Sequence, residues 1–351
     1  MTGAGPAGTG AERPVKCVVW DLDHTLWDGV LLEDPRVRLR PGVAAVIRTL
    51  DSRGILHSIA SRNDHDAAVA ALDRFGLLDY FLYPQITWGA KSESIRAIGQ
   101  TLNLGLDSLA FVDDDPVERA EVQFSLPAVR CLDAGDAAGL ADRPELSPRL
   151  VTDEARLRRR MYQAARVRED DAARFGGPPE AFLATLGMRL QITAARPEDL
   201  ARAEELTLRT NQLNTTGRTY SRAELDALRR SNDHDLLVAR LADRYGPYGT
   251  IGLALVGRAP GTWVIKLLLV SCRVISRGIG AALLNHLRRA AHGAGVRLQA
   301  DFVPSGRNRM MRITYTFAGF REVGRRGELV RLEADRGEPP PFPDYLQVNV
   351  D

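Results

Sequence analysis

The chain has 351 residues, of which 44% are hydrophobic and 26% charged, proportions typical of soluble globular proteins. Its 47 basic and 45 acidic residues leave a net charge of +2, which argues against a nucleic-acid partner. Three scattered cysteines are too few for a disulfide framework or a zinc site, so we expect a reducing, cytoplasmic location. No apolar run approaches the roughly 18 residues of a membrane span, and the first residues lack a signal peptide's apolar core, so no membrane partner is expected.

Residues 1–13 are rich in glycine, alanine and threonine, and we expect them to be disordered. Residues 14–140 form the first predicted domain, in which short apolar strands alternate with helices. The strands are predicted at 17–20, 55–60, 80–83 and 108–112, and the helices at 41–54, 66–75, 92–102 and from 117 onward. This alternation predicts an α/β fold with a doubly wound parallel sheet, whose functional groups gather at the carboxyl ends of the strands.

Residues 141–186 differ in composition, because an arginine-rich helical stretch lies between prolines, and we interpret them as a helical connector. Residues 187–336 form the second predicted domain. Its elements are a strand at 188–195, a helix at 197–213, three antiparallel strands within 234–274, a helix at 277–295 and a strand at 297–303. This order predicts an α+β domain. Residues 337–351 are expected to be a C-terminal tail.

Two acidic clusters follow strands of the first domain. Asp21 and Asp23 stand two residues apart at one strand end, and Asp113 and Asp114 stand at another. Because the carboxyl ends of parallel strands meet at one edge of a sheet, both clusters could converge on one cation, and Mg²⁺ prefers such oxygen ligands. A single acidic pair after a strand is typical of a helix cap or turn. The two clusters together predict a Mg²⁺ site, and its expected ligands are Asp21, Asp23, Asp113 and Asp114.

The segment WDLDHTLWDG, which contains Asp21, resembles the first motif of the haloacid dehalogenase superfamily of phosphotransferases. Ser61, Lys91 and the segment VDDDP match its second, third and fourth motifs, at successive intervals of 40, 30 and 22 residues. The resemblance implies that Asp21 attacks phosphorus to form an aspartyl-phosphate, while Asp23 protonates the leaving group and later activates water. It also implies a set of phosphate-binding residues, which are Thr25, Ser61, Arg62, Asn63 and Lys91.

The intervals between these motifs are short. Only 37 residues lie between Asp23 and Ser61, and 29 lie between Ser61 and Lys91. After the predicted helices and strands are subtracted, neither interval can hold a cap domain. We therefore expect a capless haloacid dehalogenase-like domain with an open site.

The second domain contains the segment LLLVSCRVISRGIGAALLNHLRR, which resembles the acyl-coenzyme A-binding segment of the GCN5-related N-acetyltransferase fold. In that fold a strand runs into a glycine turn whose N–H groups hold pyrophosphate at a helix N-terminus. Ile275 stands where the family usually carries Gln or Arg, and Arg277 lies next to the glycine instead. The resemblance implies an acetyltransferase-like α+β domain.

Both domains in this order resemble the FkbH-like proteins of polyketide biosynthesis, from about Val15 to Leu332. The matching segments include RTNQLN, VDDDPVER and FVPSGRN. The resemblance implies a Mg²⁺-dependent glyceryltransferase/phosphatase that removes the phosphates of 1,3-bisphosphoglycerate. The D-glyceryl group would be loaded onto the phosphopantetheine arm of an acyl carrier protein, to supply methoxymalonyl-type extender units.

Cys272 is the candidate nucleophile for this acyl transfer. It lies near a predicted strand end beside Arg273 and the glycine turn, where cations and N–H groups favour a thiolate. Arg273, Asn211 and Asn214 are candidates for binding glyceryl or pantetheine. A buried, inert cysteine and turn-forming asparagines are open alternatives. Two other functions also stay open, a phosphatase whose second domain only docks a partner, and a noncatalytic carrier-docking module.

Overall fold

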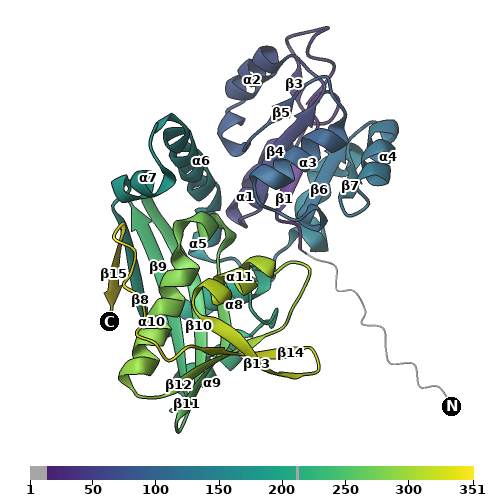
Figure 1. Cartoon of the computed structure of the whole chain (residues 1–351). Coiled ribbons are helices and arrows are strands. Elements are labelled where there is room, and N and C mark those ends of the chain that lie inside the picture. The colour runs from purple at the N-terminus through teal and green to yellow at the C-terminus, as the bar shows by residue number, and fades with distance from the viewer. Residues whose placement is uncertain (1–13, 211–212) are drawn as a thin grey trace, which may run out of the picture. The chain divides into compact units, whose positions relative to one another are not determined.

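The structure, a computed structural model, describes residues 14–210 and 213–351 (Figure 1). The chain divides into two compact units, Met1–Gln163 and Ala164–Asp351. The disorder expected for residues 1–13 lies outside the described residues. In the described parts of the chain, no helix combines the length and the apolar character needed to span a membrane.

The first unit is built on a five-stranded parallel sheet with the order β5-β4-β1-β6-β7 (Figure 1). Its strands are β1 (Cys17–Trp20), β4 (Leu56–Ser61), β5 (Gln85–Ile86), β6 (Leu109–Asp113) and β7 (Arg130–Asp133). Four helices flank this sheet, α1 (Val43–Ser52), α2 (His65–Arg74), α3 (Lys91–Thr101) and α4 (Pro116–Ser125). The doubly wound parallel sheet is thus as predicted.

Side chains of β1 alternate between two cores, since successive residues of a strand point to opposite faces of its sheet. Val18 and Trp20 pack in the core that includes α1 and α2. Cys17 and Val19 pack in the core that includes α3 and α4. A strand buried on both faces explains why the sequence of β1 is apolar throughout.

Only small elements lie between the motifs of this unit. The hairpin of β2 (Trp27–Asp28) and β3 (Arg38–Leu39) precedes α1, and the 3₁₀ turn η1 (Leu78–Tyr80) follows α2. No cap domain is therefore inserted between residues 21 and 91, as predicted. The remaining elements are η2 (Leu106–Ser108), η3 (Ala134–Asp142), η4 (Pro144–Leu146), α5 (Asp153–Arg156) and α6 (Arg158–Arg174).

The strand predicted at residues 80–83 was misplaced. Phe81 makes only an isolated bridge to His57, and Tyr83 has a positive φ of 50°, which turns the chain before Pro84. Regular pairing with β4 begins after this turn, in β5. The apolar character of this segment comes from burial of Phe81 and Leu82 in the two cores, which requires no strand.

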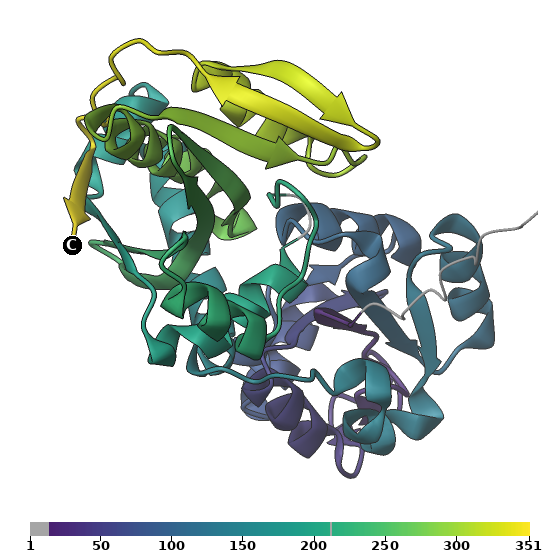
Figure 2. The same ribbon diagram turned by 90° about the horizontal axis from the view of Figure 1, so that it is seen from below.

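The second unit is built on an eight-stranded mixed sheet with the order β13-β14-β12-β11-β10-β9-β8-β15. Its C-terminal strands β13 and β14 are among the yellow arrows in Figure 2. Its strands are β8 (Met188–Ala194), β9 (His234–Asp243), β10 (Gly246–Ala259), β11 (Thr262–Val270), β12 (Arg297–Phe302), β13 (Phe320–Arg326), β14 (Leu329–Ala334) and β15 (Leu346–Val350). β8 to β11 form an antiparallel meander, and β11 then pairs in parallel with β12. This α+β arrangement confirms the predicted fold class.

Helices cover both faces of this sheet. One core includes α7 (Pro179–Thr185), α10 (Ile279–Gly293) and α11 (Arg309–Phe317). The other includes α8 (Leu200–Arg209) and α9 (Arg222–Arg230). Two short 3₁₀ segments, η5 (Pro197–Asp199) and η6 (Cys272–Arg277), precede α8 and α10.

Two segments of the second unit differ from expectation. The helix predicted at 197–213 ends at Arg209, because Thr210 is extended. Residues 337–351, expected to be a tail, supply β15, which pairs in parallel with β8 while Leu346 packs in the core. The stretch predicted as a connector, 141–186, contains η4, α5, α6 and α7, and the division between the units falls within α6.

Candidate active site

The neighbouring strands β1 and β6 bring two carboxylates together at the edge of the first sheet. Asp21 directly follows β1, and Asp113 is the last residue of β6. The two strands pair in register as far as Trp20 and Val112, and the Asp21 N–H donates to the Val112 carbonyl over 2.9 Å. The parallel pairing thus fixes which residues meet at this strand edge.

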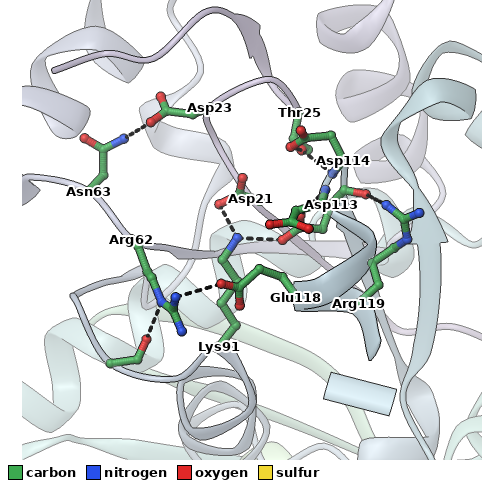
Figure 3. A network of polar contacts seen from close by, with 12 residues as sticks. Asp21, Asp23, Thr25, Arg62, Asn63, Lys91, Asp113, Asp114, Glu118 and Arg119 are labelled. Atoms are coloured by element: carbon green, nitrogen blue, oxygen red, sulfur yellow. Dashed lines mark hydrogen bonds and ion pairs between the residues drawn. The ribbon is translucent and has the colours of Figure 1, made fainter. Parts of the chain in front are cut away.

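Lys91, the first residue of α3, lies between these carboxylates (Figure 3). Its Nζ is 2.9 Å from Asp21 Oδ1 and 2.6 Å from Asp113 Oδ2. Only 5% of Lys91 is exposed, and both carboxylates are buried. The ammonium therefore joins the two strand ends away from bulk water.

Burial and charge shift the titration of all three groups. Burial raises the pKa of Asp21 to about 6, although the Lys91 ammonium opposes the rise. Burial also raises the pKa of Asp113 above its usual value. For Lys91, burial disfavours the ammonium, but the attraction of the two carboxylates outweighs it and raises the pKa.

Asp21, Asp113 and Asp114 each place one carboxylate oxygen within 4.8 Å of the others. Thr25 orients Asp114, because its hydroxyl accepts from the Asp114 N–H at 3.0 Å and donates to Oδ1 at 3.1 Å. Three carboxylates face one ammonium, so a divalent cation would relieve the remaining repulsion. Carboxylate oxygens are also the ligands that Mg²⁺ prefers. The residues present therefore fit a Mg²⁺ ion.

The carboxylate of Asp23 lies outside this group and faces Asn63 (Figure 3). It accepts from Trp27 Nε1 at 2.7 Å, from the Leu31 N–H at 3.0 Å and from Asn63 Nδ2 at 2.9 Å. The Asp23 carboxylate is therefore not one of the three that cluster around Asp21. Asn63, expected to bind phosphate, holds Asp23 and accepts from the Asp64 N–H.

The other expected phosphate-binding residues lie around Asp21. Ser61 ends β4 and is hydrogen-bonded to Asp21. Arg62 lies at an exposed position, where it forms a 2.8 Å ion pair with Glu118 and donates to the Gly89 carbonyl at 3.2 Å. Glu118 was not predicted, although its place in the VDDDPVER segment, five residues after Asp113, was a signal for it.

Arg119, also not predicted, supports the end of β6. Its guanidinium donates to the Asp113 carbonyl and to the Asp133 carboxylate, both at 2.6 Å. Asp133 ends β7, so the contact joins α4 to two neighbouring strand ends. No sequence periodicity indicates the contact between Arg119 and Asp133, because these two residues are 14 positions apart.

A known magnesium-dependent enzyme is similar in sequence to part of this chain, in agreement with carboxylates that fit a Mg²⁺ ion. Human magnesium-dependent phosphatase 1 is 31% identical over 140 residues, which cover 34% of this chain and 78% of that protein. The chain belongs to the magnesium-dependent phosphatase family. The predicted enzyme class and the predicted Mg²⁺ cofactor are thereby confirmed at the level of the family. No family model matches the chain.

Two solved structures illustrate what this family member is similar to. The N-terminal part of a Bacteroides fragilis protein, which contains a phosphatase domain complexed with Mg, is 29% identical, with a TM-score of 0.34. The match covers 38% of the chain described here and only 40% of the Bacteroides fragilis chain. The ribosomal-protein-S18-alanine N-acetyltransferase of Escherichia coli is 18% identical, covers 44% of this chain and 99% of that chain, and has a TM-score of 0.34.

The second unit of this phosphatase family member holds the remaining expected residues. Cys272 is the first residue of η6, separated from the end of β11 by Ser271, and is a half-buried free thiol. Arg273 donates from Nε to Ser271 Oγ over 3.4 Å. Asn211 lies outside the described residues.

The side chain of Asn214 makes three hydrogen bonds within a turn. Its Oδ1 accepts from the N–H groups of Thr216 and Gly217 at 3.1 and 2.9 Å, and its Nδ2 donates to the Arg218 carbonyl at 3.4 Å. Its side chain is also almost fully buried, at 1% exposed. These hydrogen bonds are those of the turn role that the sequence left open for Asn214.

Proposed function

We propose that the chain is a Mg²⁺-dependent glyceryltransferase/phosphatase that dephosphorylates 1,3-bisphosphoglycerate and loads D-glyceryl onto an acyl carrier protein in the cytoplasm, for methoxymalonyl-type polyketide extender units. The observation that carries the phosphatase half is the buried Asp21–Lys91–Asp113 cluster. The carboxylates of Asp21 and Asp113 also lie close to that of Asp114, and the three together fit a Mg²⁺ ion. The transferase half rests on the FkbH-like resemblance and on the free thiol of Cys272.

In the phosphatase reaction, an Asp21 oxygen attacks the phosphorus of the 3-phosphate, and the bond from phosphorus to the sugar-acid oxygen breaks. Asp23 gives the leaving oxygen its proton, and it later takes a proton from the water that hydrolyses the aspartyl-phosphate. Three donors fix the Asp23 carboxylate for this exchange. Lys91 orients Asp21 and neutralises charge. Asp21, Asp113 and Asp114 would hold a Mg²⁺ ion, whose charge would reduce the repulsion between carboxylate and phosphate.

In the transfer reaction, the Cys272 thiolate attacks the C1 carbonyl of the acyl phosphate, and phosphate leaves with the electrons of the broken C–O bond. The carrier's pantetheine, as a thiolate, then attacks the thioester carbonyl, and the C–S bond to Cys272 breaks to regenerate the Cys272 thiolate. Burial raises the pKa of Cys131 to about 11 and raises that of fully buried Cys17 above its usual value, which disfavours both as nucleophiles. Cys272 is thus the preferred thiol.

Intact-mass spectrometry after incubation with 1,3-bisphosphoglycerate and Mg²⁺ tests the transferase half. We expect an adduct of about 88 Da that is absent in Cys272→Ala and retained in the control Cys131→Ala. Phosphate release without this adduct would instead support a phosphatase whose second unit only docks a partner. Persistent release of the 3-phosphate in Asp21→Asn would refute the catalytic role of the first site.

A further inference from the structure

The parallel strands β11 and β12 separate partway along their length. They pair over Thr262–Ile265 and Arg297–Ala300, after which their facing backbone groups need other partners. Extended ligands with amide groups bind such open strand edges by completing the hydrogen bonding. If the second unit bound coenzyme A, as its resemblance to acetyltransferases implies, the gap between β11 and β12 would be available for the amide groups of that ligand.

A segment of the chain itself, residues 213–215, fills this gap. On the β11 side, the Val270 N–H donates to the Leu213 carbonyl at 3.0 Å, and the Thr215 N–H donates to the Leu268 carbonyl at 3.1 Å. The Thr215 hydroxyl also accepts from the Leu268 N–H at 3.1 Å. On the β12 side, the Val303 N–H donates to the Thr215 carbonyl at 3.0 Å. The segment thus bridges both strands as an added strand would.

The side chain of Asn308, the residue before α11, also binds this segment. Its Nδ2 lies 3.2 Å from the Asn214 carbonyl and 2.8 Å from the Val303 carbonyl, and its Oδ1 accepts from the Ser305 N–H. Asn308 is 2% exposed and Thr215 is fully buried. Removing a polar partner at such a depth leaves backbone carbonyls unsatisfied, so the closure is a stable part of the fold.

The start of α10, where the resemblance places pyrophosphate, is covered as well. Gly278 has a φ of 73°, and a Cβ added there would lie 2.6 Å from the Tyr345 hydroxyl. Asn285 and Arg289 of α10 donate to the carbonyls of Pro341 and Pro340, at 3.1 and 2.9 Å. The C-terminal segment that carries Tyr345 is thus bound along α10.

We infer that the second unit excludes coenzyme A, because its own residues occupy both the strand gap and the helix start that a nucleotide-linked thioester would need. Ile275, in place of the family's usual Gln or Arg, agrees with this inference. This part of the inference rests on the proposed function. The acyl acceptor is then a pantetheine thiol bound to a carrier protein, and this acceptor has no nucleotide and no pyrophosphate.

Isothermal titration of the full chain with coenzyme A and with acetyl-coenzyme A, at up to ~1 mM ligand and in the presence of Mg²⁺, tests this exclusion. We expect no saturable heat. Saturable binding with a Kd below ~100 µM would overturn the inference. Failure of the proposed function would look different, as missing phosphate release or a missing Cys272 adduct, neither of which depends on coenzyme A.

Hydrogen exchange of the Leu268 and Val270 amides tests the closure itself. We expect Asn308→Ala to speed their exchange by at least ~10-fold, whereas Asn232→Ala, at an exposed asparagine, leaves it unchanged. Thr215→Val, which keeps shape but removes the acceptor of the Leu268 N–H, should speed exchange at Leu268 if Asn308→Ala does not fold. Unchanged protection in the folded variants would contradict the closure.

Discussion

Lys91 Nζ lies 2.9 Å from Asp21 Oδ1, and both side chains are almost completely buried. Removing two charges from water costs several kcal/mol, so such a pair contributes little net stability. Its value lies in chemistry, because it keeps an ammonium beside the attacking carboxylate in a place that water cannot screen.

Replacing Lys91 with arginine should reduce phosphate release by at least ~100-fold, because a wide planar guanidinium cannot replace a compact ammonium between Asp21 and Asp113. Free phosphate measured over time gives this ratio. Lys266→Arg, at an exposed position of β11, is the matched control and should retain full activity. An active Lys91→Arg variant would show that charge alone suffices at this position.

Removing the hydroxyl of Thr25 should weaken Mg²⁺ binding by about 10- to 100-fold, because Thr25 orients the Asp114 carboxylate through two hydrogen bonds. For Thr25→Val, the Mg²⁺ concentration for half-maximal phosphate release should rise, with partial recovery of rate at saturating Mg²⁺. Thr101→Val, at the exposed end of α3, should leave the Mg²⁺ dependence unchanged. An unchanged Mg²⁺ dependence in Thr25→Val would show that the Thr25 hydroxyl does not contribute to Mg²⁺ binding.

Asp23 is oriented in part by the indole of Trp27. Trp27→Phe keeps an aromatic ring but removes the Nε1 donor that lies 2.7 Å from Asp23. We expect kcat for phosphate release to fall by about 10-fold, with little change in KM, because proton transfer depends on the position of this carboxylate. Trp88→Phe, at a tryptophan that is 67% exposed, is the control. A change confined to KM would instead indicate a substrate-binding role for Trp27.

His57 should make the first unit less stable in acid. Its Nδ1 accepts from Trp20 Nε1 at 3.0 Å, and its Nε2 lies 3.0 Å from the Ile47 carbonyl. Burial lowers the pKa of His57 to about 3, from 6.5 in the unfolded chain. The unfolded state therefore binds the extra proton, so stability is complete above about pH 6.5 and falls as the pH drops toward 3.

The expected loss between pH 7 and pH 5 is about 2 kcal/mol in the free energy of unfolding, measured by denaturant titration at both pH values. His57→Gln can still accept and donate a hydrogen bond but does not titrate, so its pH dependence should be smaller by that amount. His65→Gln, at an exposed histidine, should behave like the unaltered protein. Equal pH dependence in all three proteins would exclude His57 as the titrating group.

Much of the first site could be predicted from the sequence, because each of its main residues follows a strand or begins a helix. Asp21, Ser61 and Asp113 lie at ends of parallel strands, and the geometry of such a sheet brings those ends to one edge. Lys91 begins a helix that starts from the same edge. Strand ends therefore indicated the acidic clusters and their metal chemistry, and the resemblance to the haloacid dehalogenase motifs added Ser61 and Lys91.

Side-chain direction within that cluster required the tertiary structure. The two-residue spacing places Asp21 and Asp23 near one strand end, but Asp23 turns toward Trp27, Leu31 and Asn63. These donors come from β2 and from two loop positions, and hydrophobic periodicity does not report where such short segments place their N–H groups. The same reason hides the pairing of Arg62 with Glu118, which is 56 positions away.

In the second unit, the meander of strands and the helix after the glycine turn could be predicted from sequence patterns, and Cys272 stays a predicted nucleophile. The folded chain was needed to show that residues 213–215 close the gap between β11 and β12, and that Tyr345 covers Gly278. Segments distant along the chain make these contacts, and their hydrogen bonds form only after the sheet has assembled. Local periodicity reports which face of an element is buried, whereas long-range hydrogen bonding determines what occupies the space beside it.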